Sequence, residues 1–321
     1  MARNVRLREL LVGIEGLALL RHLYDGTDDD AGRRLAEVRR LLDDETFAAG
    51  ELISEAGPRA GYGLWSQRYD EPGNPIIALE EPEVWSLLEA LPPGPALDAA
   101  CGTGRHARHL VSLGHDVMGV DLTPEMLDRA RLAVPEAVFH QADLSGIPAE
   151  DGQFALIVCG LALAHVADLS PPISELARVL ATGGHLIVSV LHPFQALLGW
   201  HAPFEGEPGE RRFVREYPHS HADYLNAFNA VGLQVRHCIE PELSAAEIVS
   251  KRTRLPPRPR RHHRRLRRPP GSAHLGRREA LTHTATPAPE RRESALGTQL
   301  YELFENRGQE QPHLLLSELH V

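Results

Sequence analysis

The sequence predicts an α/β protein built on a doubly wound, mostly parallel sheet. Short apolar runs alternate with helical segments at a regular spacing, and this alternation is typical of parallel strands joined by helical crossovers. A turn rich in glycine also follows the first of these runs. The expected elements are strands at 95–99, 116–120, 136–140, 154–159 and 185–191, with helices at 105–113, 124–132 and 171–179.

The glycine-rich turn lies between the first strand and the first helix. Asp98 is followed by Ala-Ala-Cys-Gly-Thr-Gly, and the next apolar run ends in Asp121. Such a turn lets backbone approach a ligand, and an acid at the end of the second strand can accept hydrogen bonds from two ribose hydroxyls. The sequence therefore predicts a site for a cofactor that carries adenosine.

Helical segments flank this core on both sides. We expect an N-terminal helix at 5–22 and a second at 30–43, with Asp28 to Asp30 supplying its N-cap and first-turn negative charge. Residues 57–75 contain too much glycine and proline for a core element. The remaining expected elements are helices at 81–91, 221–231 and 243–250 and a strand at 233–239.

The last part of the chain differs in composition from the rest. Residues 251–321 carry a net charge of +8 and the preceding residues −18, which together give the net −10 of the whole chain. Residues 251–270 are rich in Arg and Pro and cannot bury enough apolar surface to offset the entropy of ordering. We expect three parts: a helical N-terminal region and cofactor lid (1–80), a core (81–250) and a disordered basic tail (251–321).

Five motifs in order resemble class I S-adenosylmethionine-dependent methyltransferases of the small-molecule type. The resemblance runs from Gly61 to Pro241 and begins with a GY..W...YDEPGNP segment. The motifs are LDAACGTG (97–104), GVDLTPEML (119–127), QADLSGIP (141–148), FALIVCGLALAHV (154–166) and RVLATGGHLIVSVLHP (178–193). This resemblance implies S-adenosylmethionine as the cofactor and a small molecule as methyl acceptor.

The resemblance also implies roles for particular residues. Asp98 would lie near the amine of the cofactor, Asp121 would bind its ribose, and Asp143 would face its adenine amino group. The full set implied to bind the cofactor is Tyr69, Asp98, Ala100, Gly102, Gly104, Asp121, Leu122, Met126, Asp143, Leu144 and Cys159.

Histidines are the candidate groups of the acceptor side. His165, in the loop after the fourth strand, could accept a proton during methyl transfer, or it could only line the pocket. His192 follows the fifth strand and is a second candidate for the pocket wall. The spacing of His219, His221 and Asp223 is too loose to indicate a metal site, and we expect none.

Two other classes of protein remain open. The glycines at 102 and 104 with Ala107 also fit a dinucleotide-binding turn, so an NAD(P)-dependent oxidoreductase shares the fold. Asp98 argues against it, because a carboxylate there would repel a pyrophosphate. A non-catalytic protein is the other alternative. The methyltransferase sheet ends in a strand for which Pro256 and Pro257 are unsuited, so either Leu314 to Leu316 form that strand or the sheet is incomplete.

Composition indicates the compartment and excludes some partners. Cys101, Cys159 and Cys238 lie far apart, which favours buried thiols in a reducing cytoplasm. The N-terminal Leu-rich stretch is interrupted by acids, so we expect an amphipathic helix rather than a signal peptide or a membrane anchor. The acidic body disfavours nucleic acid as a partner. The acceptor atom (O, N, S or C) and the oligomeric state stay open.

Overall fold

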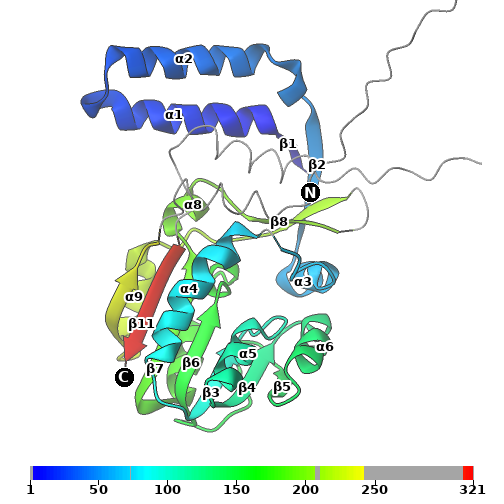
Figure 1. Cartoon of the computed structure of the whole chain (residues 1–321), viewed down its shortest axis with the longest axis vertical. Coiled ribbons are helices and arrows are strands. Elements are labelled where there is room, and N and C mark those ends of the chain that lie inside the picture. The colour runs from blue at the N-terminus through cyan, green and yellow to red at the C-terminus, as the bar shows by residue number, and fades with distance from the viewer. Residues whose placement is uncertain (1–2, 73, 207–209, 242–313, 321) are drawn as a thin grey trace, which may run out of the picture.

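The main sheet has seven strands in the order β10-β11-β7-β6-β3-β4-β5 (Figure 1). The computed structural model describes residues 3–72, 74–206, 210–241 and 314–320. Every pairing in this sheet is parallel except those of β11, which runs antiparallel to both neighbours. The strands are β3 (Pro95–Ala99), β4 (Asp116–Asp121), β5 (Val138–Gln141), β6 (Phe154–Gly160), β7 (Leu180–Leu191), β10 (Gln234–Ile239) and β11 (Leu314–His320). The predicted fold class is confirmed.

Helices cover both faces of this sheet. One face packs against α4 (Pro75–Glu89), α5 (Arg105–Ser112) and α6 (Pro124–Ala133), which contribute Leu88, Leu110 and Leu127 to one apolar cluster. The other face packs against α7 (Ser170–Val179) and α9 (His221–Ala230), with Leu176 and Phe228 in a second cluster. Burial of these two apolar layers is the main term that stabilises the domain.

The structure contains the last strand of the sheet, whose presence the sequence did not decide. Leu314–His320 forms β11 and lies between β7 and β10, so the first of the two alternatives is confirmed. The tail that we expected to be disordered therefore does not extend over these residues. The rest of that tail and the helix expected at 243–250 lie outside the described residues.

A second sheet joins the N-terminal region to the core. Its order is β1-β2-β9-β8, and β2 pairs in parallel with β9. The strands are β1 (Arg3–Arg6), β2 (Gly50–Ala56), β8 (Ala202–Glu205) and β9 (Arg211–Val214). The last two come from the segment between β7 and α9, which the sequence analysis did not assign. A division of the chain at residues 80 and 250 stays a proposal, and strand pairing crosses the first of these boundaries.

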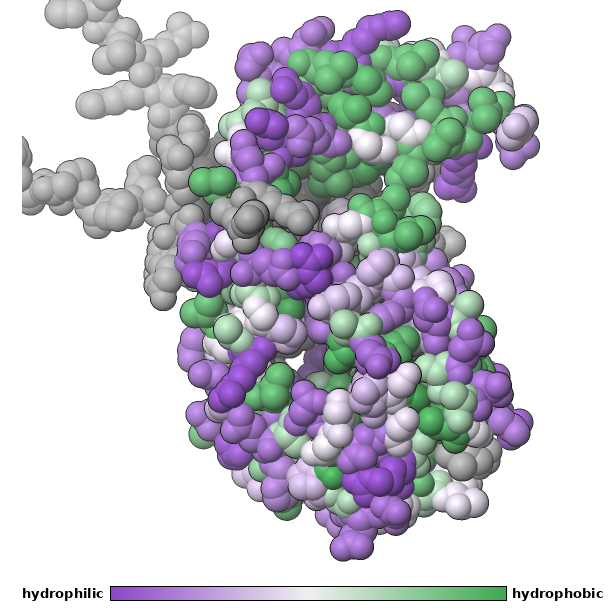
Figure 2. All heavy atoms as spheres, turned by 180° about the vertical axis from the view of Figure 1, so that it is seen from behind, coloured by the Kyte–Doolittle hydropathy of each residue, from purple (hydrophilic) through white to green (hydrophobic). Residues whose placement is uncertain are grey.

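The N-terminal hairpin consists of α1 (Leu7–Asp25) and α2 (Asp28–Asp43). The N-cap of α2 is Thr27, which forms a capping box with Asp30, so the cap expected at Asp28 to Asp30 lies one residue earlier. The hairpin has a small core of its own, from Leu7, Leu11 and Leu41. It projects away from the main sheet in Figure 1, and apolar side chains gather on the face seen in Figure 2.

The segment in front of the core is more regular than the sequence indicated. Residues 57–75 were expected to form no core element, but Pro58–Trp65 forms α3, which begins with a proline suited to the first helical turn. α4 begins at Pro75, where Asn74 caps it, rather than at residue 81. A short 3₁₀ turn, η1 (Glu45–Phe47), precedes β2, and a short helix, α8 (Pro193–Leu197), follows β7.

No helix in the described parts of the chain combines the length and the apolar character that crossing a bilayer requires.

The central position of β11 makes its backbone amides sensitive to proline. Leu316 pairs with Ser189 on one side and Ile239 on the other. Leu316→Pro should lower the free energy of unfolding by on the order of 3 kcal/mol, because a ladder hydrogen bond is lost inside the sheet. Urea unfolding measures this. Leu316→Val, which keeps the amide, is the control; equal stability of the two variants would contradict the strand assignment.

Candidate active site

A cavity of about 270 Å³ lies at the carboxyl ends of β3, β4, β5 and β6, beneath α3. Ligands of open α/β sheets bind at this end of the strands. Eight of the residues predicted to bind the cofactor line it, together with His165. These eight are Tyr69, Ala100, Gly102, Asp121, Leu122, Met126, Asp143 and Leu144.

The two glycines of the turn have different structural roles. Both have positive φ, +54° at Gly102 and +83° at Gly104. A Cβ on Gly102 would meet nothing within 4 Å, so this backbone faces the open cavity. A Cβ on Gly104 would lie 3.3 Å from both Ala130 and Val134, so Gly104 allows α5 to pack closely on α6. Gly104 does not line the cavity, so its expected contact with the cofactor stays a prediction.

Asp121 links the turn to the end of β4. One carboxylate oxygen accepts the amide of Gly102 at 2.9 Å, and the other accepts the amide of Thr123 at 2.8 Å. Burial raises the pKa of Asp121, while these two amides oppose the increase. Each oxygen keeps a further lone pair for a ligand hydroxyl.

Asp143 and three apolar side chains form the wall that continues from Asp121. Asp143 is exposed, and one of its oxygens accepts the amide of Ser145 at 2.8 Å. The apolar side chains are Leu122, Met126 and Leu144. An acceptor beside apolar surface suits a planar base with an exocyclic amine.

Asp98 and Cys159 do not line the cavity, so their expected interaction with the cofactor stays a prediction. Asp98 is buried and accepts the amide of Ala107 at 2.8 Å, so it anchors the first turn of α5. Its other oxygen has no hydrogen-bond partner, and burial raises the pKa of Asp98 to about 6. Cys159 belongs to the core, where burial raises the pKa of its thiol to about 12.

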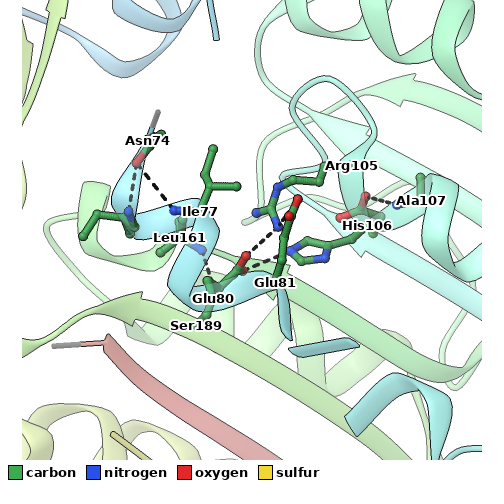
Figure 3. A network of polar contacts seen from close by, with 11 residues as sticks. Asn74, Ile77, Glu80, Glu81, Arg105, His106, Ala107, Leu161 and Ser189 are labelled. Atoms are coloured by element: carbon green, nitrogen blue, oxygen red, sulfur yellow. Dashed lines mark hydrogen bonds and ion pairs between the residues drawn. The ribbon is translucent and has the colours of Figure 1, made fainter. Parts of the chain in front are cut away.

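A buried ion cluster joins α4, α5 and β7 (Figure 3). Glu80 of α4 is fully buried. One of its oxygens accepts from Ser189 Oγ at 2.7 Å and from His106 Nε2 at 3.0 Å, and the other accepts from Arg105 at 2.5 Å. Burial alone would raise the pKa of Glu80, but His106 and Arg105 together lower it to about 2.

This cluster reaches the cavity wall through Leu161. Ser189 Oγ accepts the amide of Leu161 at 3.1 Å, and Leu161 lines the cavity with a positive φ of 56°. A non-glycine residue in that conformation is held there by its surroundings. A Cβ on the neighbouring Gly160 would lie 2.7 Å from His106 Nε2 and 2.9 Å from Glu80 Oε1, so only glycine fits. Sequence analysis missed Glu80, because the pattern does not tell it from its neighbour Glu81.

Tyr69 lies in a lid segment that is hydrogen-bonded to the glycine turn through the next residue, Asp70. Tyr69 lines the cavity, as predicted, and its ring packs edge-on against Trp65 at 5.2 Å. The next residue, Asp70, accepts from Thr103 Oγ1 at 2.7 Å and from Arg129 at 3.3 Å. The two interpretations of Tyr69, cofactor contact and lid packing, are therefore compatible.

Tyr62 and His165 form a pair at the other end of the cavity. The Tyr62 hydroxyl lies 2.7 Å from His165 Nε2, and both residues line the cavity. His165 Nδ1 lies 2.7 Å from the backbone carbonyl of Arg215. Burial lowers the pKa of His165 and raises that of Tyr62 well above its usual value. Sequence analysis placed His165 here but missed Tyr62, although Tyr62 stands in the segment that opens the resemblance.

Glu216 is a buried acid near this pair that sequence analysis also missed. It follows β9, and one of its carboxyl oxygens has no hydrogen-bond partner. Burial raises the pKa of Glu216 to about 8, so its carboxyl is mainly protonated at neutral pH. No sequence signal marks it, because only the pairing of β9 with β2 brings it under α3.

His192, the second candidate for the pocket wall, does not line the cavity. Its Nδ1 accepts the amide of Phe194 at the start of α8, and its Nε2 lies 3.4 Å from Glu240. His221 also contacts Glu240, so three potential metal ligands lie together. An imidazole that accepts at Nδ1 carries its proton on Nε2, which then donates to the carboxylate rather than binding a metal.

Part of the chain is similar to known methyltransferases. A family described as a methyltransferase domain matches residues 97–188, which run from β3 into β7. The matched residues include the glycine turn, Asp121, Asp143 and His165, so this part of the chain is similar to that methyltransferase domain.

Among curated relatives, a demethylmenaquinone methyltransferase of Beutenbergia cavernae is 30% identical over 146 residues, or 42% of this chain and 60% of the relative. A malonyl-[acyl-carrier protein] O-methyltransferase of Erwinia billingiae is 35% identical over 95 residues, or 30% of this chain and 38% of the relative. The chain thus spans less than two thirds of the length of each of these relatives. The solved S-adenosylmethionine dependent methyltransferase of Mesorhizobium loti is 20% identical, with a TM-score of 0.49, over 75% of this chain and 97% of that one.

Glu80 offers a test of the ion cluster. Glu80→Gln should lower the free energy of unfolding by about 3–5 kcal/mol, because Arg105 would keep a buried charge without its partner. Glu81→Gln is the matched control, and its effect should stay below about 1 kcal/mol, since Glu81 is more exposed and lies 3.7 Å from Arg105.

The same pair of variants gives a pH test. The folded-state pKa of Glu80 is lowered from 4.5 to about 2, so its contribution is complete above pH 4.5 and is lost as the pH falls toward 2. Stability curves should therefore fall less steeply in this window for Glu80→Gln than for Glu81→Gln. Parallel curves would contradict the ionised state of Glu80.

Proposed function

We propose that this protein transfers a methyl group from S-adenosylmethionine to a small-molecule acceptor. The observation that carries the proposal is the placement of Asp121 and Asp143 beside Leu122, Met126 and Leu144 in one cavity, next to the open backbone at Gly102.

The residues present fit the cofactor. Asp121 offers carboxylate oxygens for vicinal hydroxyls, and Asp143 offers one for an exocyclic amine. Buried beneath the turn, Asp98 has an oxygen with no partner and adds negative charge near the place where an amino-acid amine would lie. When bound, S-adenosylmethionine supplies a methyl group on a sulfonium, which is already a good leaving group.

The protein's own contribution is then mainly positioning. The glycine turn and Asp121 fix one end of the site, and the lid with Tyr69 closes over it. Tyr62 and His165 form the opposite end, where the acceptor would lie in line with the methyl group. Holding two reactants in line can account for a large part of the rate enhancement.

The class of acceptor belongs to this proposal. The names of two relatives refer to demethylmenaquinone and to malonyl-[acyl-carrier protein], and both are methyl acceptors outside nucleic acids. A small-molecule acceptor agrees with the small volume of the cavity and the acidic body of the chain. A cytoplasmic location is part of the same proposal. Cys101 and Cys159 are buried free thiols, as expected, whereas Cys238 is exposed.

The two rival classes have less support. In an oxidoreductase, a pyrophosphate would lie at the turn directly above Asp98. The non-catalytic alternative depended on a missing strand, and β11 fills that position.

Binding of S-adenosylhomocysteine tests the proposal. Calorimetry should detect saturable binding, and Asp121→Asn should weaken it by about 1–3 kcal/mol, the usual loss for a charged hydrogen-bond partner. The matched control is Asp128→Asn on α6, whose side chain is largely exposed and pairs with Arg131. Affinity for NAD, or none for S-adenosylhomocysteine, would contradict the function; equal affinity of the two variants would contradict only the ribose assignment.

A further inference from the structure

We propose that Tyr62 and His165 form a proton relay that takes the proton of a phenolic or enolic hydroxyl, which makes this protein an O-methyltransferase. This inference rests on the proposed function and adds to it the acceptor atom and the route of the proton.

The hydrogen bonds fix the direction of the relay. The carbonyl of Arg215 can only accept, so His165 Nδ1, at 2.7 Å from it, carries a hydrogen. A neutral imidazole then has its lone pair on Nε2, which accepts the hydroxyl of Tyr62 at 2.7 Å. The phenolic oxygen of Tyr62 keeps its own lone pairs, and these are available to accept a hydroxyl from a ligand in the cavity that Tyr62 lines.

The surroundings keep the pair neutral before the reaction. Burial lowers the pKa of His165, the hydrogen bond to the Arg215 carbonyl opposes this decrease, and His201 adds to it. The net effect is a lowered pKa, which favours the neutral imidazole at neutral pH. Glu216, from the loop after β9, is mainly protonated because its pKa is raised to about 8. Tyr69 and Asp121 are the other titratable groups that influence Tyr62, and together with burial they keep its pKa high, so Tyr62 transmits a proton rather than standing as a phenolate.

The aromatic surroundings favour an unsaturated acceptor. Tyr62 stacks on Trp65 at 5.7 Å and meets Tyr69 edge-on at 6.0 Å. Such rings pack well against another aromatic or conjugated group. A phenol ionises near pH 10, much closer to imidazole than an aliphatic alcohol does, so the relay suits phenols and enols. An amine attacks through its lone pair without first losing a proton and has no need of this base.

The transfer balances with these groups alone. The acceptor oxygen bonds to the methyl carbon as its O–H bond breaks. Its proton goes to the oxygen of Tyr62, whose own proton moves to His165 Nε2. The bond between the methyl carbon and sulfur breaks with its electron pair on sulfur. The positive charge thus moves from sulfur to His165, whose Nδ1–H faces the Arg215 carbonyl. Release of this proton to solvent resets the relay.

Paired acceptors test the acceptor atom. With S-adenosylmethionine, the full-length protein should convert 4-ethylphenol to its methyl ether and leave 4-ethylaniline largely unchanged, as chromatography of the products would show. Preference for the aniline, or no methylation of 4-ethylphenol while S-adenosylhomocysteine still binds, overturns the relay and leaves the proposed function standing. Failure to bind S-adenosylhomocysteine removes both.

Substitutions test the route of the proton. Tyr62→Phe and His165→Gln should each reduce kcat/KM for 4-ethylphenol by about 100-fold or more, the usual contribution of a base. Gln can still accept the Tyr62 hydroxyl but cannot take its proton, so retention of activity in His165→Gln would show positioning alone. Tyr217→Phe is the control, because Tyr217 lies outside the cavity lining. Unchanged affinity for S-adenosylhomocysteine in all three shows that folding is intact.

The pH profile and a pre-ionised acceptor separate a base from a structural role. In the wild type, kcat/KM should fall as the pH drops through a pKa below 6.5, where His165 becomes protonated, and this limb should be absent in His165→Gln. 4-Nitrophenol, studied above its own pKa, needs no base, so both variants should recover most of their activity with it. A profile shared by wild type and variant, or an equal loss with both phenols, would overturn the relay.

Discussion

The carboxylate of Glu80 is the interaction on which the site depends. It lies in the interior of the fold and accepts hydrogen bonds from α5 and β7, while its own helix, α4, connects to the lid. Through Ser189 it also holds Leu161, whose strained backbone forms part of the cavity wall. A buried charge with this many partners is satisfied in only one arrangement of the elements around it. The ion cluster therefore fixes the geometry behind the cofactor side of the cavity.

The acidic residues near the strand ends contribute to the cofactor side of the cavity in different ways. Asp121 and Asp143 face the cavity, whereas Asp98 points into the protein and secures the first turn of α5. The glycines divide in the same way, since Gly102 opens toward the cavity and Gly104 permits two helices to pack. A sequence motif that is typical of ligand binding thus contains two kinds of residue: some face the cavity, and others pack in the interior and hold the first kind in place.

The acceptor side is built from segments that are far apart in the sequence. Tyr62 comes from α3, His165 from the turn after β6, and Arg215 from the end of β9. The parallel pairing of β2 with β9 brings the lid and the 202–214 insertion together. Variation around Tyr62 and Arg215 can change the acceptor without disturbing the turn that would hold the cofactor, because these residues flank the second sheet, whereas the turn follows β3 of the main sheet.

The sequence by itself determined the doubly wound sheet, the turn and most residues of the cofactor side, because strand alternation and glycine spacing are local signals. Only the tertiary structure decided which acids face the cavity, since Asp98 and Asp121 end neighbouring strands with similar patterns. It also supplied Glu80, Tyr62 and Glu216. Their burial and their partners depend on contacts between segments that are distant in the sequence, and hydrophobic periodicity does not predict such contacts.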